Sequence, residues 1–126
     1  MKGVIIFFVL ALFGWATLAE SQAPGDLLQA GEVIFLKNCA DCHRANGEGI
    51  PNSFPALAKN PLVLGDAHQL IAIVLNGRKG KLGRMPAWKN KLDDQQLAAV
   101  VSYIRQAWTN QASPVTPALV APLRKK

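Results

Sequence analysis

The stretch Cys39-Ala40-Asp41-Cys42-His43 decides how this chain folds. Two thiols three positions apart can each add to a vinyl group of one porphyrin, and a histidine directly after them can supply an axial nitrogen to its iron. Cys39 and Cys42 are the only cysteines of the sequence, so such a site would use both. The pattern therefore predicts one covalently bound haem c, with Cys39 and Cys42 as thioethers and His43 as a metal ligand.

Two other uses of a cysteine pair are weaker interpretations of this stretch. A tetrahedral zinc site needs four ligands, whereas the chain offers two cysteines and two histidines, with His68 far along the sequence. A redox dithiol of the thioredoxin type is expected in a βαβ context, and the sequence lacks that pattern. Haem attachment is favoured over both.

Residues 1–19 are interpreted as a targeting segment outside the fold. Lys2 is followed by an uncharged, largely apolar run from Gly3 to Ala19, which ends in small residues. This run is slightly long for the core of a signal peptide and slightly short for a membrane span of about 20 residues. Two outcomes stay open: cleavage after Ala19 to give a soluble periplasmic protein, or retention as an amino-terminal anchor in the inner membrane.

Apolar spacing predicts an all-α domain at residues 26–110, after a linker at 20–25. The expected helices run from the cap Asp26 to about Asn38, from the cap Asp66 to the stop Asn76-Gly77, and from Asp93 or Asp94 along an apolar stripe to Trp108. A long loop region separates the first two, and no segment has the pattern of a strand.

The tail at residues 111–126 contains three prolines and ends in three basic residues. It is interpreted as a surface-draped or mobile segment, with a single helical turn from Pro117.

Met85 is the candidate for the second axial position of the iron. It is the only methionine beyond Met1, and the adjoining Pro86 fixes its own φ and biases Met85 towards an extended backbone. A thioether is soft and raises the reduction potential relative to a second imidazole. Methionine more often fills gaps in a core, but beside a haem motif we favour ligation. His68 competes for the same position and is expected to be solvated.

Together these residues resemble the class I cytochromes c, small bacterial electron carriers and cytochrome subunits. The resemblance covers about residues 27 to 108. It rests on Gly31 and Phe35, the Cys39–His43 motif, Phe54-Pro55-Ala56-Leu57, Met85-Pro86-Ala87-Trp88, and Val100 and Tyr103 in the last helix. It implies an all-α fold of three to five helices and loops wrapped around one covalent haem, with the first and last helices crossing.

The resemblance also implies roles for two residues around the haem. The backbone carbonyl of Pro55 is expected to accept a hydrogen bond from Nδ1 of His43, which orients the ring and raises its basicity. Trp88 is expected to pack against the haem. The order of motifs is most similar to cytochrome subunits of membrane dehydrogenases or oxidases.

The chain carries a net charge of +6, and part of that charge is concentrated before and after Met85. Six bases lie in one stretch without an acid, namely Arg78, Lys79, Lys81, Arg84, Lys89 and Lys91. Such runs are often merely solvated, but this density favours a patch that docks an acidic redox partner. A nucleic-acid partner is not expected for an exported haem protein.

The function predicted from these features is one-electron transfer in a periplasmic respiratory or dehydrogenase chain, with no catalytic residue. An iron with both axial positions filled has no site for a substrate, so its role is to change oxidation state. The alternatives are a peroxidase-like or reductase-like subunit with an open iron site, and a dedicated cytochrome subunit of a membrane dehydrogenase or oxidase complex.

Overall fold

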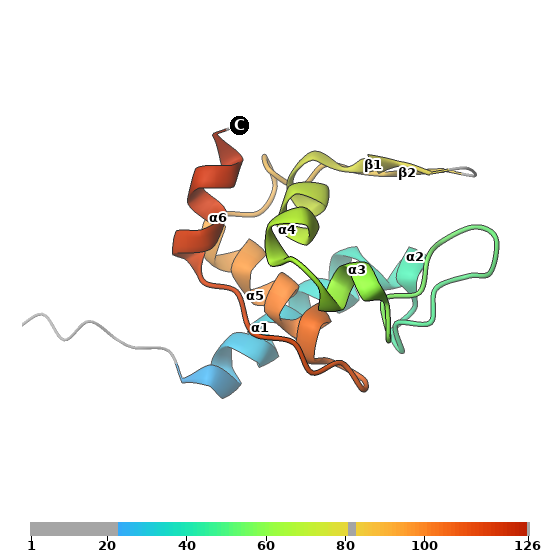
Figure 1. Ribbon diagram of the computed structural model, residues 1–126, viewed down its shortest axis with the longest axis horizontal. Coiled ribbons are helices and arrows are strands. Elements are labelled where there is room, and N and C mark those ends of the chain that lie inside the picture. Colours follow the sequence, from blue (N-terminus) through green and yellow to red (C-terminus); the bar gives the residue numbers. More distant parts are fainter. Residues whose placement is uncertain (1–22, 81–82, 126) are drawn as a thin grey trace, which may run out of the picture.

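The computed structural model describes residues 23–80 and 83–125 (Figure 1). The elements are α1 (Pro24–Asn38), α2 (Ala40–His43), α3 (Pro61–Leu64), α4 (Ala67–Asn76), β1 (Arg78–Lys79), β2 (Arg84–Met85), α5 (Asp94–Gln106) and α6 (Pro117–Arg124). The expected all-α class is confirmed. The described part has six helical segments rather than three to five, because two of them are single turns of four residues.

The long helices α1 and α5 cross in direct backbone contact (Figure 1). A Cβ placed on Gly31 would lie 2.1 Å from the carbonyl oxygen of Ala99, so only glycine permits this approach. One turn further along α1, Phe35 is fully buried, and the centre of its ring lies 5.5 Å from the centre of the Tyr103 ring. Val100 is buried at the same crossing, as the resemblance implied.

The beginnings of the three longest helices are set by different residues. α1 begins at Pro24 with Ala23 as its cap, not at Asp26, because proline at the first position loses only a hydrogen bond that the helix start lacks anyway. The side chain of Asp66 caps α4, as expected. α5 begins after Asp93, whose carboxylate and the Gln96 side chain form a reciprocal capping box.

A short antiparallel hairpin follows α4, where no strand was expected. Arg78 pairs with Met85 and Lys79 pairs with Arg84, and the amide of Gly80 donates to the carbonyl of Gly83 at 2.8 Å. Strands of two residues are too short to show the alternation by which a strand is recognised in a sequence. The expectation for Lys81 lies outside the described residues.

The tail forms an eight-residue helix, α6, rather than a single turn. It packs against α4 and α5, and Val115 and Val120 are almost fully buried. Val115 is also fixed by the hydroxyl of Ser102, which accepts from its amide at 2.8 Å. The helix begins at Pro117, as expected, but it continues past the first turn, and Pro122 lies inside it.

Two polar side chains at the end of α5 and just after it satisfy main-chain groups of the surrounding loops. Arg105 is only 5% exposed, and its guanidinium donates to the carbonyls of Val63, Gly65 and Ser113 at 2.7, 3.0 and 2.8 Å. Asn110 is similarly buried: it accepts from the amide of Lys59 and donates to the carbonyls of Leu57 and Ile104. The loops around the core are therefore held from the end of α5.

No helix among residues 23–80 and 83–125 is both long and apolar enough to cross a membrane. Both outcomes expected for residues 1–19 lie outside the described residues.

Replacing Arg105 with methionine keeps an unbranched apolar stem and removes the guanidinium with its three hydrogen bonds. Because three carbonyls then lose their donor, we expect the free energy of unfolding to fall by about 2–4 kcal/mol. Urea titration monitored by far-ultraviolet circular dichroism measures this. The matched control is Lys37→Met on the exposed surface of α1, expected within about 0.5 kcal/mol of the wild type. Equal stability of the two variants would contradict the role assigned to Arg105.

Candidate haem site

The two cysteines lie on one helical turn that continues from α1. The amide of Cys39 donates to the carbonyl of Phe35 at 2.8 Å, and the amide of His43 donates to the carbonyl of Cys39 at 2.9 Å. Cys42 follows Cys39 by three positions, which places both side chains on the same face of the turn. Both thiols are free, Cys42 is exposed, and Cys39 packs against the core.

The two thiols have different surroundings. Burial, with a smaller contribution from the neighbouring Cys42, raises the pKa of Cys39 to about 11. The Cys39 thiol of the unattached chain is therefore protonated at neutral pH.

The imidazole of His43 is buried and anchored through one of its nitrogens. Its Nδ1 lies 2.9 Å from the carbonyl oxygen of Pro55, the contact that the family resemblance implied. With the proton on Nδ1, the ring donates to this carbonyl and Nε2 keeps a free lone pair. A histidine held in this way is prepared to bind a metal through Nε2.

The loop that brings Pro55 back to His43 depends on Gly49. This glycine has a φ of +63°, and a Cβ on it would lie 2.4 Å from the Phe54 carbonyl oxygen and 2.6 Å from that of Pro55. Paired hydrogen bonds of 2.9 Å between Ile50 and Phe54 close the loop. The sequence predicts a loop rich in glycine and proline here, but the close approach of Gly49 to Phe54 and Pro55 leaves no periodic signal in it.

Trp108 covers the start of the same loop, although it was expected in the apolar stripe of the last helix. It lies beyond the end of α5 with a φ of +62°, and its indole nitrogen donates to the carbonyl of Ala45 at 2.9 Å. Its ring lies 5.4 Å from Phe35 and 5.8 Å from Tyr103. The helical spacing of this tryptophan was misleading, since the backbone leaves the helix after Gln106 and the ring returns to the core.

Burial, and to a smaller extent the carboxylate of Glu32, raises the pKa of the Tyr103 phenol in this aromatic cluster. The rings of Phe35, Tyr103 and Trp108 contact one another and form an apolar support beside the turn that carries the cysteines.

Met85 ends the hairpin and is half buried against the core. Its carbonyl lies against Gly77, because a Cβ placed on Gly77 would lie 2.5 Å from the carbonyl oxygen of Met85. Three residues later the chain is tied to the end of α4, because the amides of Trp88 and Lys89 donate to the carbonyls of Val74 and Leu75, each at 3.1 Å. Met85 is thus anchored on both sides.

The hairpin approaches the loop that contains Pro55. A Cβ on Gly83 would lie 3.8 Å from the ring of Phe54, the residue before Pro55. In Figure 1 the hairpin and the loop after α2 both extend to the right, away from α6. The segments that carry the two candidate ligands therefore lie on one side of the molecule.

The other candidate residues lie around this region. Trp88 is half buried against the core, with the ammonium of Lys91 5.1 Å from its ring centre. Of the six bases in the acid-free stretch, the structure describes five, and all five are exposed: Arg78, Lys79, Arg84, Lys89 and Lys91. We call them the hairpin basic patch.

His68, the competitor for the axial position, is exposed at the start of α4. Its Nδ1 lies 2.8 Å from the carboxylate of Asp66. The His68 amide first, and then its ring, lower the pKa of that carboxyl group. This histidine is bound to its helix cap and not to the core.

The residues of the turn and its loop fit a covalent haem. Two free thiols follow each other on one helical turn, and the adjacent imidazole is fixed through Nδ1 with Nε2 uncommitted. The family described as "Cytochrome C oxidase, cbb3-type, subunit III" matches residues 26–104. The chain belongs to the cytochrome c family. Its cofactor is accordingly haem c, and Cys39 and Cys42 are present with the spacing of a CXXCH motif.

Small cytochromes are among the similar proteins. This cytochrome is 41% identical over 75 residues to cytochrome c6 of Leptolyngbya boryana, covering 60% of this chain and 86% of that protein. It is 32% identical over 120 residues to a cytochrome c-552 of Thermus thermophilus, covering 86% and 73%. A solved structure of the c-type cytochrome XoxG from Methylobacterium extorquens AM1 has the same fold, with a TM-score of 0.54 at 18% identity over 79% of this chain and 65% of that one.

Larger subunits match as well. The cytochrome is 38% identical over 92 residues to the cytochrome c subunit of the quinone alcohol dehydrogenase of Gluconobacter oxydans, which covers 66% of this chain and 19% of that subunit. It is 38% identical over 118 residues to the gluconate 2-dehydrogenase cytochrome c subunit of Pantoea cypripedii, covering 86% and 27%. The chain thus spans about a fifth to a quarter of the length of these subunits.

Replacing Gly49 with alanine tests how closely the loop packs behind His43. The added Cβ meets the carbonyls of Phe54 and Pro55 at a positive φ, so we expect the free energy of unfolding of the haem-bound protein to fall by about 2–3 kcal/mol. Denaturant titration monitored by Soret circular dichroism measures it. The control is Gly25→Ala in the first turn of α1, where no atom lies within 4 Å of the new Cβ. A Gly49→Ala protein as stable as this control would refute the packing argument.

Proposed function

We propose that this cytochrome transfers single electrons, with His43 and Met85 as the two axial ligands of its haem iron. The observation that carries the proposal is the pair of anchored candidate ligands. The imidazole of His43 is held by the carbonyl of Pro55, and half-buried Met85 lies on a hairpin tied to α4. The bound haem supplies a one-electron couple.

The residues of this chain keep the site rigid and apolar. His43 is oriented by Pro55, Met85 is fixed between Gly77 and Trp88, and the rings of Phe35, Tyr103 and Trp108 support the cysteine turn. Ligands held in place before and after electron transfer require little rearrangement, which suits a carrier better than a catalyst. We therefore assign no catalytic residue, and an open iron site is disfavoured.

The names of relatives support a second, more specific candidate. Two of them are cytochrome c subunits of an alcohol dehydrogenase and a gluconate 2-dehydrogenase. Another is the CcoP subunit of the cbb3-type oxidase of Azospirillum brasilense, 32% identical over 94 residues, covering 70% of this chain and 31% of that subunit. We propose accordingly that this cytochrome serves a dehydrogenase or an oxidase, either as a separate carrier or as its dedicated subunit.

The apolar run near the amino terminus and the hairpin basic patch support proposals for the localisation and for the redox partner. The apolar run at residues 3–19 supports export to the periplasm, with the segment either cleaved or retained as an anchor in the inner membrane. The hairpin basic patch lies beside Met85 in the fold, so an acidic surface on the redox partner would be oriented towards the haem region.

Changing Met85 tests the second axial ligand. Met85→Ala is expected to lower the reduction potential by on the order of 100 mV, to abolish the near-infrared charge-transfer band of the ferric protein and to admit cyanide. Met85→His is the matched comparison: it should also lower the potential, while cyanide binding stays slow. Spectroelectrochemistry and cyanide titration provide the measurements. If Met85→Ala keeps the wild-type band and potential, the iron has a different ligand.

Neutralising part of the basic patch tests partner steering. The variant Arg78→Gln/Lys79→Gln/Arg84→Gln is expected to slow oxidation of the reduced cytochrome by hexacyanoferrate(III), an anion, by about tenfold at low salt. The difference should vanish near 1 M salt, where the screening length is about 3 Å. Lys37→Gln, an exposed change on α1, is the control. Stopped-flow rates indifferent to both salt and the triple substitution would count against a steering patch.

A further inference from the structure

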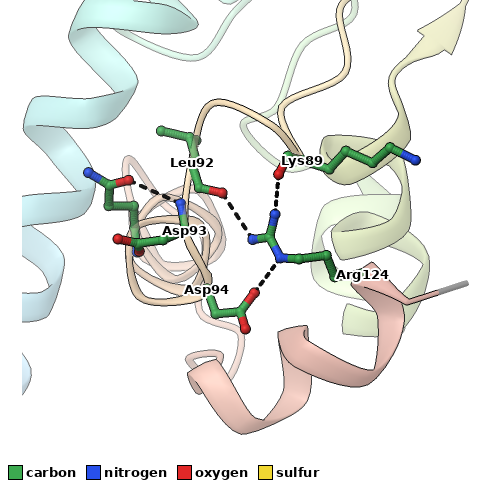
Figure 2. A network of polar contacts seen from close by, with 6 residues as sticks. Lys89, Leu92, Asp93, Asp94 and Arg124 are labelled. Carbon is green, nitrogen blue, oxygen red and sulfur yellow. Dashed lines mark hydrogen bonds and ion pairs between the residues drawn. The ribbon is translucent and has the colours of Figure 1, made fainter.

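The helix α6 ends in a guanidinium that lies against the loop following Met85 (Figure 2). Arg124 donates from Nε to the Asp94 carboxylate at 2.6 Å and from Nη2 to the carbonyl of Leu92 at 3.0 Å. Its Nη1 donates to the carbonyl of Lys89. One side chain thereby joins the two ends of residues 89–94.

These contacts complete the attachment of the loop at residues 86–93. Its amides at Trp88 and Lys89 bind the end of α4, as described above. Its carbonyls at Lys89 and Leu92 bind Arg124, and the Asp94 carboxylate extends this attachment to the first residue of α5. The loop is therefore fixed from one side by α4 and from the other by α6.

The position of Arg124 is set by the packing of its helix. Val120 is fully buried, and Leu119 and Leu123 pack against the core. The side chains of Arg124 and Asp94 are themselves 25% and 33% exposed, so their ion pair is partly shielded from water. A guanidinium held by a packed helix loses little further freedom when it binds, which strengthens its hydrogen bonds.

We propose that Arg124 is a positioning residue for Met85, which keeps the sulfur on the haem iron by fixing the loop that follows it. The inference rests on the proposed ligation by Met85. Withdrawal of Met85 requires its loop to move, and a loop movement that separates residues 89–94 from α6 breaks three charge-assisted hydrogen bonds. α6 thus resists ligand loss although it carries no ligand.

The contacts predict an order among substitutions. A lysine at position 124 carries the same charge but lacks the planar fork that reaches three separated acceptors. Asp94→Asn removes the ion pair and leaves both carbonyl contacts, so it should loosen the loop less than a change of Arg124. Lys125→Gln removes the same charge from the next, exposed position and serves as the matched control.

The test is displacement of Met85 by imidazole in the ferric, haem-bound protein. Titration of the near-infrared band with imidazole gives an apparent affinity, which rises with the fraction of molecules whose loop is open. We expect about a tenfold rise for Arg124→Gln, because charge-assisted hydrogen bonds are lost. A rise of about threefold is expected for Arg124→Lys and a smaller one for Asp94→Asn. Lys125→Gln should match the wild type.

Each outcome decides a separate point. A wild-type protein without the band would overturn ligation by Met85 before any variant is compared. With the band present, equal imidazole affinities of Arg124→Gln and Lys125→Gln would overturn the positioning role. If Arg124→Gln has a lower urea midpoint but the same imidazole affinity as Lys125→Gln, Arg124 stabilises the fold without positioning Met85. If Arg124→Gln does not fold, Arg124→Lys gives the same comparison, and a control-like affinity there equally refutes the proposal.

Discussion

The backbone contact between α1 and α5 is the constraint on which the rest of the structure depends. At Gly31 the two helices approach so closely that a methyl group would overlap the carbonyl of Ala99. This contact sets the depth at which Phe35 enters the core, one helical turn later. Cys39 follows after another turn, so the crossing sets the position of the candidate haem-binding residues.

Outside α1, the site is built from the single turn α2, the short β1–β2 hairpin and long loops. Their geometry is set by single side chains and close backbone contacts. Gly49 permits the return of Pro55, and Trp108 closes the start of that loop. Arg105 and Asn110 supply the loops on the other side with donors and acceptors. Helix α5 therefore organises the loops as well as the core.

The sequence contained the local parts of this structure. The Cys39–His43 stretch led to the cytochrome c family and to haem c, because covalent attachment requires a fixed spacing within one turn. The cap Asp66 was recognisable, and Asp93 was one of two candidates for the next cap, because a capping side chain binds the helix that it precedes. Such features involve residues only a few positions apart, where the chemistry of the side chain decides the backbone.

What the sequence could not predict involves residues brought together by the fold. The hairpin is too short to have a pattern, and α6 is a helix because the core offers its apolar side chains a surface. Arg105 has no distinguishing neighbour in the sequence, since the carbonyls of Val63 and Gly65 that it binds lie about 40 positions away.

The same separation has a consequence for the speed of folding. The hydrogen bond from Arg105 to the carbonyl of Val63 spans 42 positions, and the one from the Lys59 amide to the Asn110 side chain spans 51. Proteins whose contacts are far apart in the sequence fold more slowly than helical bundles with local contacts, because long loops must close first. Although mostly helical, this molecule should therefore have a folding rate governed by loop closure.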